Sequence, residues 1–334
     1  MPFYISTFKK GSSHSRFFLL FLLGFLFVAG LWIRAFSWQL SAPTESSRWI
    51  HECVQQKLAL AEAQTQKKIL IVSGSNALFG ISARQLSEEL QMPAVNLATH
   101  AALDIRYILH YARQAAKPGD IVLLPLEYEL YDSDGTPNEV LIDYLASRDK
   151  PYLRQMPWVE QAKVVFGMKW ERLAEGIRSK RQPPLPLQGG YEAATLNVWG
   201  DETINRMSSV SAEKWAVVEA FAPSKPLSKG LGAGNQSFAE LERFLRWCRE
   251  RNITVWASYP NLIYKAEYEK PRAQKTLPQI EQFWRQQGVP VLGTAQEYMY
   301  PVQCMYDTPY HLNEQGRKQR TQQLSGHIRQ QGLL

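Results

Sequence analysis

The chain has 334 residues, of which 45% are hydrophobic and 21% are charged, so a wholly disordered chain is excluded. This length accommodates one elaborated domain with an appendage. The net charge of +7 is spread along the chain rather than gathered in one dense stripe, which argues against a nucleic-acid-binding protein.

An uncharged apolar segment lies near the N-terminus. Residues 17–33 read FFLLFLLGFLFVAGLWI, and Arg16 and Arg34 stand at its two ends. Because this length suits a short membrane-spanning helix, we expect a single-pass transmembrane anchor at 17–36. The positive residues before it predict a cytoplasmic tail at 1–16 and a main domain that is periplasmic or extracellular. A cleaved signal peptide is less favoured because no small-residue cleavage site follows, and a buried core helix is less favoured because charged residues bracket the segment.

Beyond a helical linker at 37–66, short apolar segments alternate with amphipathic helices. The expected strands lie at 69–72, 93–98, 121–126, 253–258 and 289–293. The expected helices lie at 45–66, 81–90, 104–116, 238–250, 279–287 and 313–331. Continuous apolar strands between helices predict an α/β fold at 67–331, with a parallel sheet between two helical layers. An insertion at about 131–234, with a helix at 157–180, would be a cap over the site or a platform for a partner.

The turn SGSN at residues 73–76 follows the first expected strand. In an open parallel sheet, ligands bind beyond the carboxyl ends of the strands. There Ser75 would expose its hydroxyl, and the start of the next helix would point N–H groups at an oxyanion. A plain turn explains these four residues equally well, whereas the phosphate-loop spacing GxxxxGK[ST] is absent.

A second chemical feature, MYDTPYHLNEQG at residues 305–316, precedes the last helix. Asp307 and His311 flank a turn that contains proline. Histidine is a base at working pH without any shift of its pKa, and a nearby carboxylate fixes its tautomer. A helix-capping aspartate beside a surface histidine is the alternative. His100, after the second strand, could also approach such a site.

Together these two features resemble the first and last blocks of the SGNH (GDSL-like) esterase and acyltransferase superfamily. The resemblance implies an SGNH-like α/β/α domain in which Ser75 is the nucleophile, His311 the base and Asp307 the residue that orients it. It implies no cofactor, and the sequence has no metal-ligand motif. Where the family's own oxyanion donors are missing, Asn76, Ala101 (or Ala98), Tyr128 and Asn261 are the expected oxyanion or substrate contacts.

Three positions depart from the family pattern. Ser73 stands in place of the first glycine, and the Asp–His spacing is one residue longer than usual. The asparagine of the third block is replaced by PLEYELY, where an ionised Glu127 would repel an oxyanion.

An N-terminal anchor joined to such a domain is similar to proteins of D-alanyl-lipoteichoic acid synthesis and of alginate O-acetylation. That similarity implies an esterase or O-acyltransferase acting on acyl esters of a cell-surface polysaccharide, beside a multi-pass membrane acyltransferase. The alternative is a non-catalytic module that binds a glycan or that acyltransferase through the insertion. The membrane is an expected partner and nucleic acid is not.

Some further side chains allow two interpretations each. Asp201 and Glu202 are expected in a surface turn rather than at a substrate. The aromatic residues of the segment 256–268 would either stack on a sugar ring or pack in the core. Cys53 and Cys304 could pair outside the cytoplasm, whereas Cys248 is expected to be a buried thiol.

Overall fold

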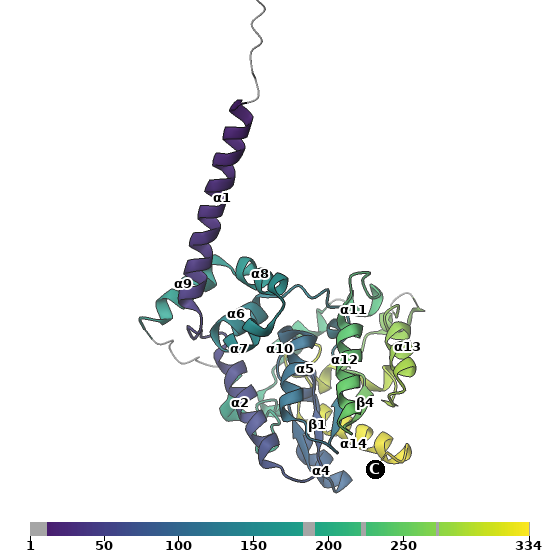
Figure 1. Ribbon diagram of the computed structural model, residues 1–334. Helices are drawn as coiled ribbons and strands as arrows, with labels where there is room; N and C mark the ends of the chain where they lie inside the picture. The colour runs from purple at the N-terminus through teal and green to yellow at the C-terminus, as the bar shows by residue number, and fades with distance from the viewer. Residues whose placement is uncertain (1–11, 183–190, 222–224, 272–273, 334) are drawn as a thin grey trace, which may run out of the picture.

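The computed structural model describes residues 12–182, 191–221, 225–271 and 274–333, so most of the expected cytoplasmic tail lies outside it (Figure 1). Its main sheet has five parallel strands in the order β2-β1-β3-β4-β6. These are β1 (Ile69–Ile71), β2 (Ala94–Asn96), β3 (Ile121–Leu124), β4 (Thr254–Ser258) and β6 (Val291–Leu292). The predicted α/β fold with a parallel sheet is confirmed.

Side chains of the central strands alternate between two apolar clusters, one on each face of the sheet. Leu70 of β1 packs with helical residues of one cluster, whereas its neighbour Ile71 packs in the other. Both faces are therefore buried, as expected for parallel strands with continuous apolar sequences. The first cluster includes side chains from α2 (Arg48–Ala63), α5 (Asp104–Ala115), α12 (Ser237–Glu250) and α13 (Leu277–Gln287). The second includes side chains from α3 (Ser75–Gly80), α4 (Ala83–Leu90) and α14 (Glu314–Gln330).

The helix α2 is built into this core. It buries Ile50, Val54 and Ala61 in the first cluster and Cys53 in the second. Its Lys57 is also buried, and the ammonium group donates to the carbonyl oxygens of Asn96 and Gly200 at 2.8 and 2.7 Å. Residues 48–63 thus pack as part of the main domain.

The N-terminal helix α1 (Ser12–Gln39) projects from the body (Figure 1). It is the one described helix that is long and apolar enough to cross a membrane, and its apolar side chains are exposed. The C-terminal end of α1 is different. Phe36 and Gln39 are buried, and the indole N–H of Trp32 donates to the carbonyl of Val165 at 2.7 Å. One end of α1 is therefore packed on the folded domain.

The described part of the insertion is mostly helical. It contains α6 (Glu139–Ser147), α7 (Lys150–Gln155), α8 (Trp158–Gly167), α9 (Trp170–Ser179), α10 (Ala212–Glu219) and α11 (Lys225–Ser228). The single helix expected at 157–180 is wrong, because the chain is extended at Met168 and Lys169. Met168 is buried against Gln39 of α1, and this tertiary contact turns the chain between α8 and α9.

A small sheet pairs β5 (Leu262–Ile263) with β7 (Met299–Tyr300) and was not anticipated from the sequence. Short 3₁₀ turns complete the described elements. They are η1 (Ala101–Leu103), η2 (Tyr128–Tyr131), η3 (Ala193–Thr195), η4 (Met207–Ser209), η5 (Ala266–Glu269), η7 (Gln296–Tyr298) and η8 (Val302–Cys304).

The surface turn expected at Asp201 and Glu202 is wrong, because both carboxylates are buried. Asp201 accepts hydrogen bonds from the N–H groups of Ala83 and Arg84, at 2.7 and 3.2 Å, and so caps the start of α4. A carboxylate is stabilised at a helix N-terminus, where N–H groups lack partners within the helix. This part of the insertion therefore holds α4 in place.

The aromatic residues of the segment 256–268, which begins within β4, pack mainly in the core. Trp256, Tyr259 and Tyr268 are buried, and only Tyr264 is exposed. They do not form a continuous surface for a sugar ring. The three cysteines are buried and free, so Cys53 is not paired with Cys304.

Candidate active site

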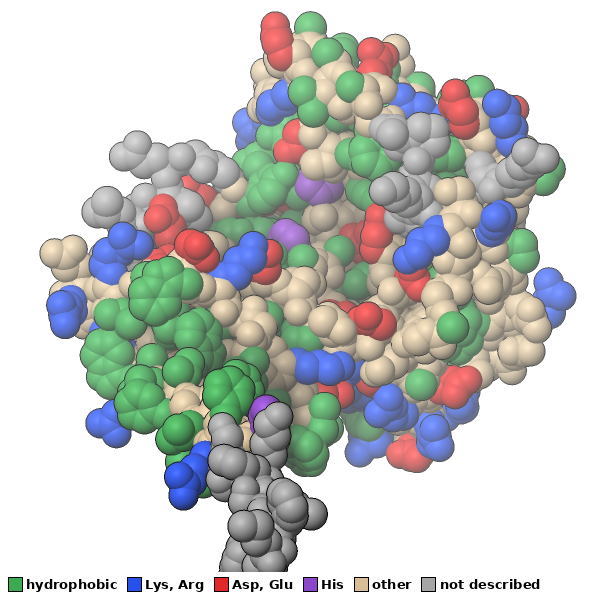
Figure 2. Space-filling view, turned by 90° about the horizontal axis from the view of Figure 1, so that it is seen from above, with side chains coloured by type: hydrophobic (Ala, Val, Ile, Leu, Met, Phe, Trp, Pro, Cys, Tyr) green, Lys and Arg blue, Asp and Glu red, His purple; other side chains and the backbone are tan. Residues whose placement is uncertain are grey.

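The predicted site residues follow the carboxyl ends of three neighbouring strands. Ser75 comes after β1, Ala101 after β2 and Tyr128 after β3, and His311 lies just before α14. This edge of the sheet lies on the side of α1. The amide of Asn138, which begins α6, donates to the carbonyl of Ala102 at 2.7 Å, and the end of α6 accepts from Ser41, just after α1. Seen from that side, the molecule is hollowed in the middle, with histidine side chains in the hollow (Figure 2).

Ser75 is the first residue of α3, as expected for a strand-to-helix turn. Its side chain is half-buried, and the hydroxyl has no hydrogen-bond partner among the described residues. Gly74 before it is required by close packing, because a Cβ there would lie 2.6 Å from the Cα of Ala101. The loop after β2 therefore touches the turn of Ser75. The N–H groups of Ser75 and Ala101 are both without partners in the described part of the chain.

Asp307 and His311 are hydrogen-bonded despite the longer spacing between them. Nδ1 of His311 lies 2.7 Å from Oδ1 of Asp307. A β-bridge between Met305 and Leu312 closes the loop, and the N–H of Tyr306 donates to the carbonyl of His311 at 2.8 Å. The extra residue is thus contained in a closed turn, which brings the two side chains face to face.

Tyr191 from the insertion contacts both members of the Asp307–His311 pair. Its hydroxyl donates to Oδ2 of Asp307 at 2.7 Å and lies 3.4 Å from Nδ1 of His311. Burial alone would raise the pKa of Asp307. The hydrogen bond and charge of His311, with the hydrogen bond of Tyr191, outweigh it and hold that pKa below its ordinary value. Asp307 is therefore suited to remain an anion that orients His311.

His311 lies against the helix that begins at Ser75. Its ring stacks on the ring of Phe79 at a centroid distance of 4.2 Å and an angle of 20°. Phe79 is four residues after Ser75, so both side chains project from the same side of α3. The structure has no hydrogen bond between Ser75 and His311. The Nε2 atom of His311 has no hydrogen-bond partner among the residues described.

Glu127 lies beside the turn that carries Ser75 and is almost completely buried. Its carboxylate accepts from the N–H of Gly74 at 3.0 Å, the N–H of Asn76 at 2.9 Å and the hydroxyl of Ser73 at 2.9 Å. Ser73 therefore helps to hold this carboxylate. A negative charge beside Ser75 would weaken the binding of an oxyanion there.

Two side chains expected to donate to an oxyanion are engaged elsewhere. The amide N–H₂ of Asn76 donates to Ser73 and to the carbonyl of Pro125, and that of Asn261 donates to the carbonyl of Tyr310. Their side-chain oxygens both accept from the buried guanidinium of Arg320. These contacts leave the N–H groups of Ser75 and Ala101 as the available donors. The Tyr128 hydroxyl, a further expected donor, is buried without a described partner.

The ring of Trp49 lies between the rings of His100 and Tyr191, near the Asp307–His311 pair. Its centroid is 5.7 Å from that of His100 and 5.4 Å from that of Tyr191. Burial lowers the pKa of His100, and the nearby His311 lowers it further, against the opposite effect of Glu127. The sequence anticipated that His100 could approach the site. Trp49 and Tyr191 were missed because neither belongs to a recognisable motif.

No protein-family model matches the chain, and no curated protein matches it. Among the described residues, no group of three or more His, Cys, Asp or Glu side chains is arranged to hold a metal ion.

Proposed function

We propose that this protein is a membrane-anchored, extracytoplasmic SGNH-like esterase or O-acyltransferase that acts on acyl esters of a cell-surface polysaccharide. The observation that carries the proposal is the Asp307–His311 pair, whose imidazole stacks on Phe79 one helical turn after Ser75. The polysaccharide and a multi-pass acyltransferase partner follow from the family resemblance. The proposed acyl transfer follows from the side chains of Ser75, His311 and Asp307.

In the proposed reaction, the Ser75 hydroxyl attacks the carbonyl carbon of an acyl ester while Nε2 of His311 takes its proton. The N–H groups of Ser75 and Ala101 donate to the oxyanion that forms. The tetrahedral intermediate then collapses, the alcohol leaves with the proton from His311, and the acyl group stays on Ser75. Water or a sugar hydroxyl, deprotonated by His311, attacks this ester and releases Ser75. Asp307 orients His311 and stabilises its charged form.

The packing of α1 supports a retained anchor rather than a cleaved signal peptide. Removal of α1 would take away Phe36 and Gln39, both buried in the domain, and the hydrogen bond between Trp32 and Val165. A signal peptide has no such structural role after cleavage. An anchor would also place the carboxyl edge of the sheet on the membrane side, where a membrane-bound acyl donor would meet it.

The second candidate function is a non-catalytic SGNH-like module that binds a glycan or an acyltransferase. Two observations favour it: Ser75 and His311 are not hydrogen-bonded, and the carboxylate of Glu127 lies beside the proposed oxyanion donors. Loss of one oxyanion donor costs about 3 kcal/mol of transition-state stabilisation, so an adjacent charge is a serious obstacle to hydrolysis.

The two functions are separated by reacting the full-length protein in detergent with a fluorophosphonate probe and with p-nitrophenyl acetate. Catalysis predicts labelling and turnover that are lost in Ser75→Ala and in His311→Ala. The matched controls, Ser208→Ala and His327→Ala, should keep both. A folded protein that stays unlabelled and inactive, also after reconstitution with its membrane partner, would refute the enzyme and leave the binding module.

A further inference from the structure

Large apolar side chains are exposed on the helices α8 and α9. Trp158 is 79% exposed, Phe166 is 55% exposed and Trp170 is 64% exposed. Val159, also exposed, lies two helical turns before Phe166 and so on the same side of α8. Three large exposed aromatic side chains within 13 residues of sequence are typical of an interaction surface. We call the exposed residues Trp158, Val159, Phe166 and Trp170 the α8–α9 face.

This face lies beside the end of the apolar segment of α1. The carbonyl that accepts from Trp32 belongs to Val165, the residue before Phe166. Trp32 lies at the C-terminal end of the uncharged run 17–33. This run is about 24 Å long when it is helical. If α1 spans a bilayer, Trp32 lies at the depth where tryptophan is enriched, the boundary between acyl chains and headgroups. The backbone of Phe166, next to the Val165 carbonyl that binds Trp32, then lies close to this depth.

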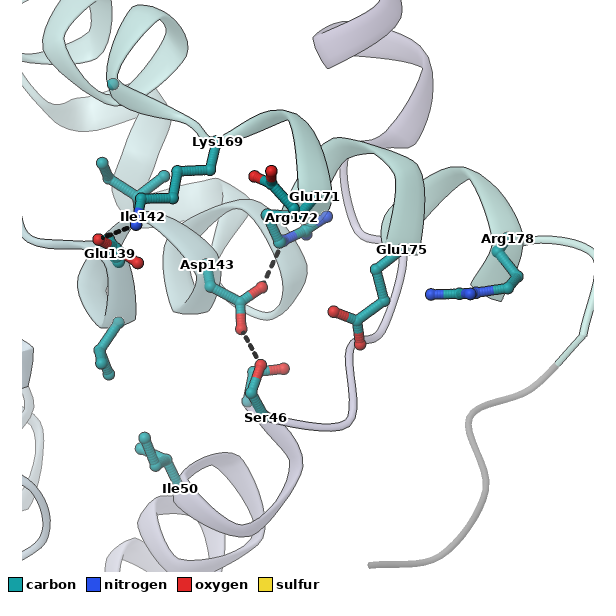
Figure 3. A pocket seen from close by; sticks show the side chains of 13 residues that line it. Ser46, Ile50, Glu139, Ile142, Asp143, Lys169, Glu171, Arg172, Glu175 and Arg178 are labelled. Carbon is teal, nitrogen blue, oxygen red and sulfur yellow. Dashed lines mark hydrogen bonds and ion pairs between the residues drawn. The ribbon is translucent and has the colours of Figure 1, made fainter.

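The position of α9 relative to α1 is fixed by buried polar contacts. Arg172 of α9 donates to the side chain of Gln39 at 2.6 Å and forms an ion pair with Asp143 of α6. Asp143 also accepts from Ser46 at 2.7 Å, so that α9, α6 and the start of the main domain are tied together (Figure 3). These contacts line one side of a cavity of about 430 Å³ under α9. The α8–α9 face therefore cannot swing freely away from α1.

The charge of this segment matches a lipid surface. Residues 150–181 contain eight Lys or Arg and three Glu, and a basic excess remains although Lys169 and Arg172 pair with Glu139 and Asp143 of α6. Helices that combine exposed aromatic residues with an excess of basic residues bind at the surface of membranes that contain anionic lipids. The Lys180 ammonium, for example, lies 5.5 Å above the ring of Trp38 in α1, at the same end of the molecule.

We propose that the α8–α9 face inserts its aromatic side chains into the headgroup region of the membrane that α1 crosses. The inference rests on the proposed anchor, and it adds a second contact with the bilayer. Because the domain is packed on the end of α1, the two tilt as one body, and a second contact with the bilayer would fix that tilt. The carboxyl edge of the sheet then faces the membrane at a constant height.

The test uses the full-length chain in vesicles of phosphatidylcholine and phosphatidylglycerol. A spin label is attached to Phe166→Cys, and its collisions with oxygen and with a water-soluble nickel chelate are compared by EPR. The native cysteines are buried, so an introduced exposed cysteine reacts selectively. The matched control is Val198→Cys, which is 69% exposed and lies near Leu60 and Ala63 at the other end of α2. Phe25→Cys reports on α1 itself.

We expect the label at Phe25 to favour oxygen and the label at Val198 to favour nickel, with the label at Phe166 between the two, as its depth in the headgroup region requires. A label at Phe166 that behaves like the one at Val198, with Phe25 in lipid, would refute the membrane contact and leave the anchor intact. Nickel access at Phe25 as well would refute the anchor. A label at Phe166 shielded from both reagents would refute the membrane contact in favour of a protein partner.

Discussion

The carboxylate of Glu127 binds the backbone N–H groups on both sides of Ser75. One oxygen accepts from Gly74 at 3.0 Å and the other from Asn76 at 2.9 Å. This contact ties the start of α3 to the end of β3 and gives the helix N-terminus a negative partner, which stabilises it. Arg320 balances the charge from the opposite side through the side chain of Asn76. The turn of Ser75 is therefore held between two buried charges.

Replacing Glu127 by glutamine should destabilise the fold. The amide N–H₂ of Glu127→Gln would face one of the two N–H groups, which would lose its acceptor in a buried site. We expect the free energy of unfolding to fall by about 1–3 kcal/mol, measured by urea denaturation. Glu88→Gln is the control, because that carboxylate is exposed, and its effect should stay within about 0.5 kcal/mol. Equal stability of the two variants would contradict this role.

A side chain at position 74 should separate the two loops that carry the proposed oxyanion donors. The Cβ of Gly74→Ala would lie 2.5 Å from Glu127 and 2.6 Å from Ala101. We expect a loss of about 1–3 kcal/mol in unfolding free energy together with loss of probe labelling at Ser75. Gly326→Ala is the control, since its Cβ meets no atom within 4 Å, and it should stabilise α14 by about 0.5–1 kcal/mol. Undiminished labelling of Gly74→Ala would show that the close approach is not needed.

Asp307→Asn tests the orientation of His311. The amide cannot accept the Nδ1 proton with the strength of a carboxylate, and it can turn its N–H₂ toward the ring, which favours the wrong tautomer. If the site hydrolyses esters, we expect turnover of p-nitrophenyl acetate to fall by about 10⁴-fold with the fold intact. Tyr191→Phe removes only one hydrogen bond to Asp307 and should cost much less, on the order of tenfold. A greater loss from Tyr191→Phe than from Asp307→Asn would mean that Tyr191 itself takes part in the reaction.

The sheet and the Asp307–His311 pair were predictable because their signals are local in the sequence. Apolar runs mark the strands, and the two members of the pair are only four positions apart in the sequence. Tyr191 could not be found this way, since it reaches Asp307 across 116 positions from a segment without a motif.

The break between α8 and α9 at Met168 and the burial of Asp201 could not be predicted from the sequence for the same reason. Each depends on a tertiary contact, with Gln39 in one case and with the start of α4 in the other. Helical periodicity and local polarity do not encode such contacts.

The half-buried ring of His100 should make the fold sensitive to mild acid. Burial is the main cause that lowers its pKa in the folded protein. The nearby His311 lowers this pKa further, and Glu127 acts in the opposite direction. Above about pH 6.5 the ring is neutral in both the folded and the unfolded chain. As the pH falls below that value, the unfolded chain binds a proton that the folded chain does not bind until its own lower pKa is reached. The free energy of unfolding therefore falls over this interval.

The variant His100→Asn should weaken this pH dependence. Its side-chain oxygen can replace Nδ1 as the acceptor for the N–H of Ala102, which lies 3.0 Å away in the native protein. We expect its stability to lie close to that of the native protein at about pH 7.5 and its loss at about pH 5.5 to be smaller, measured by urea denaturation at both. Burial also lowers the pKa values of His51 and His110. Part of the dependence of the unfolding free energy on pH should therefore remain in this variant. Identical slopes in the native protein and His100→Asn would show that His100 does not contribute to acid sensitivity.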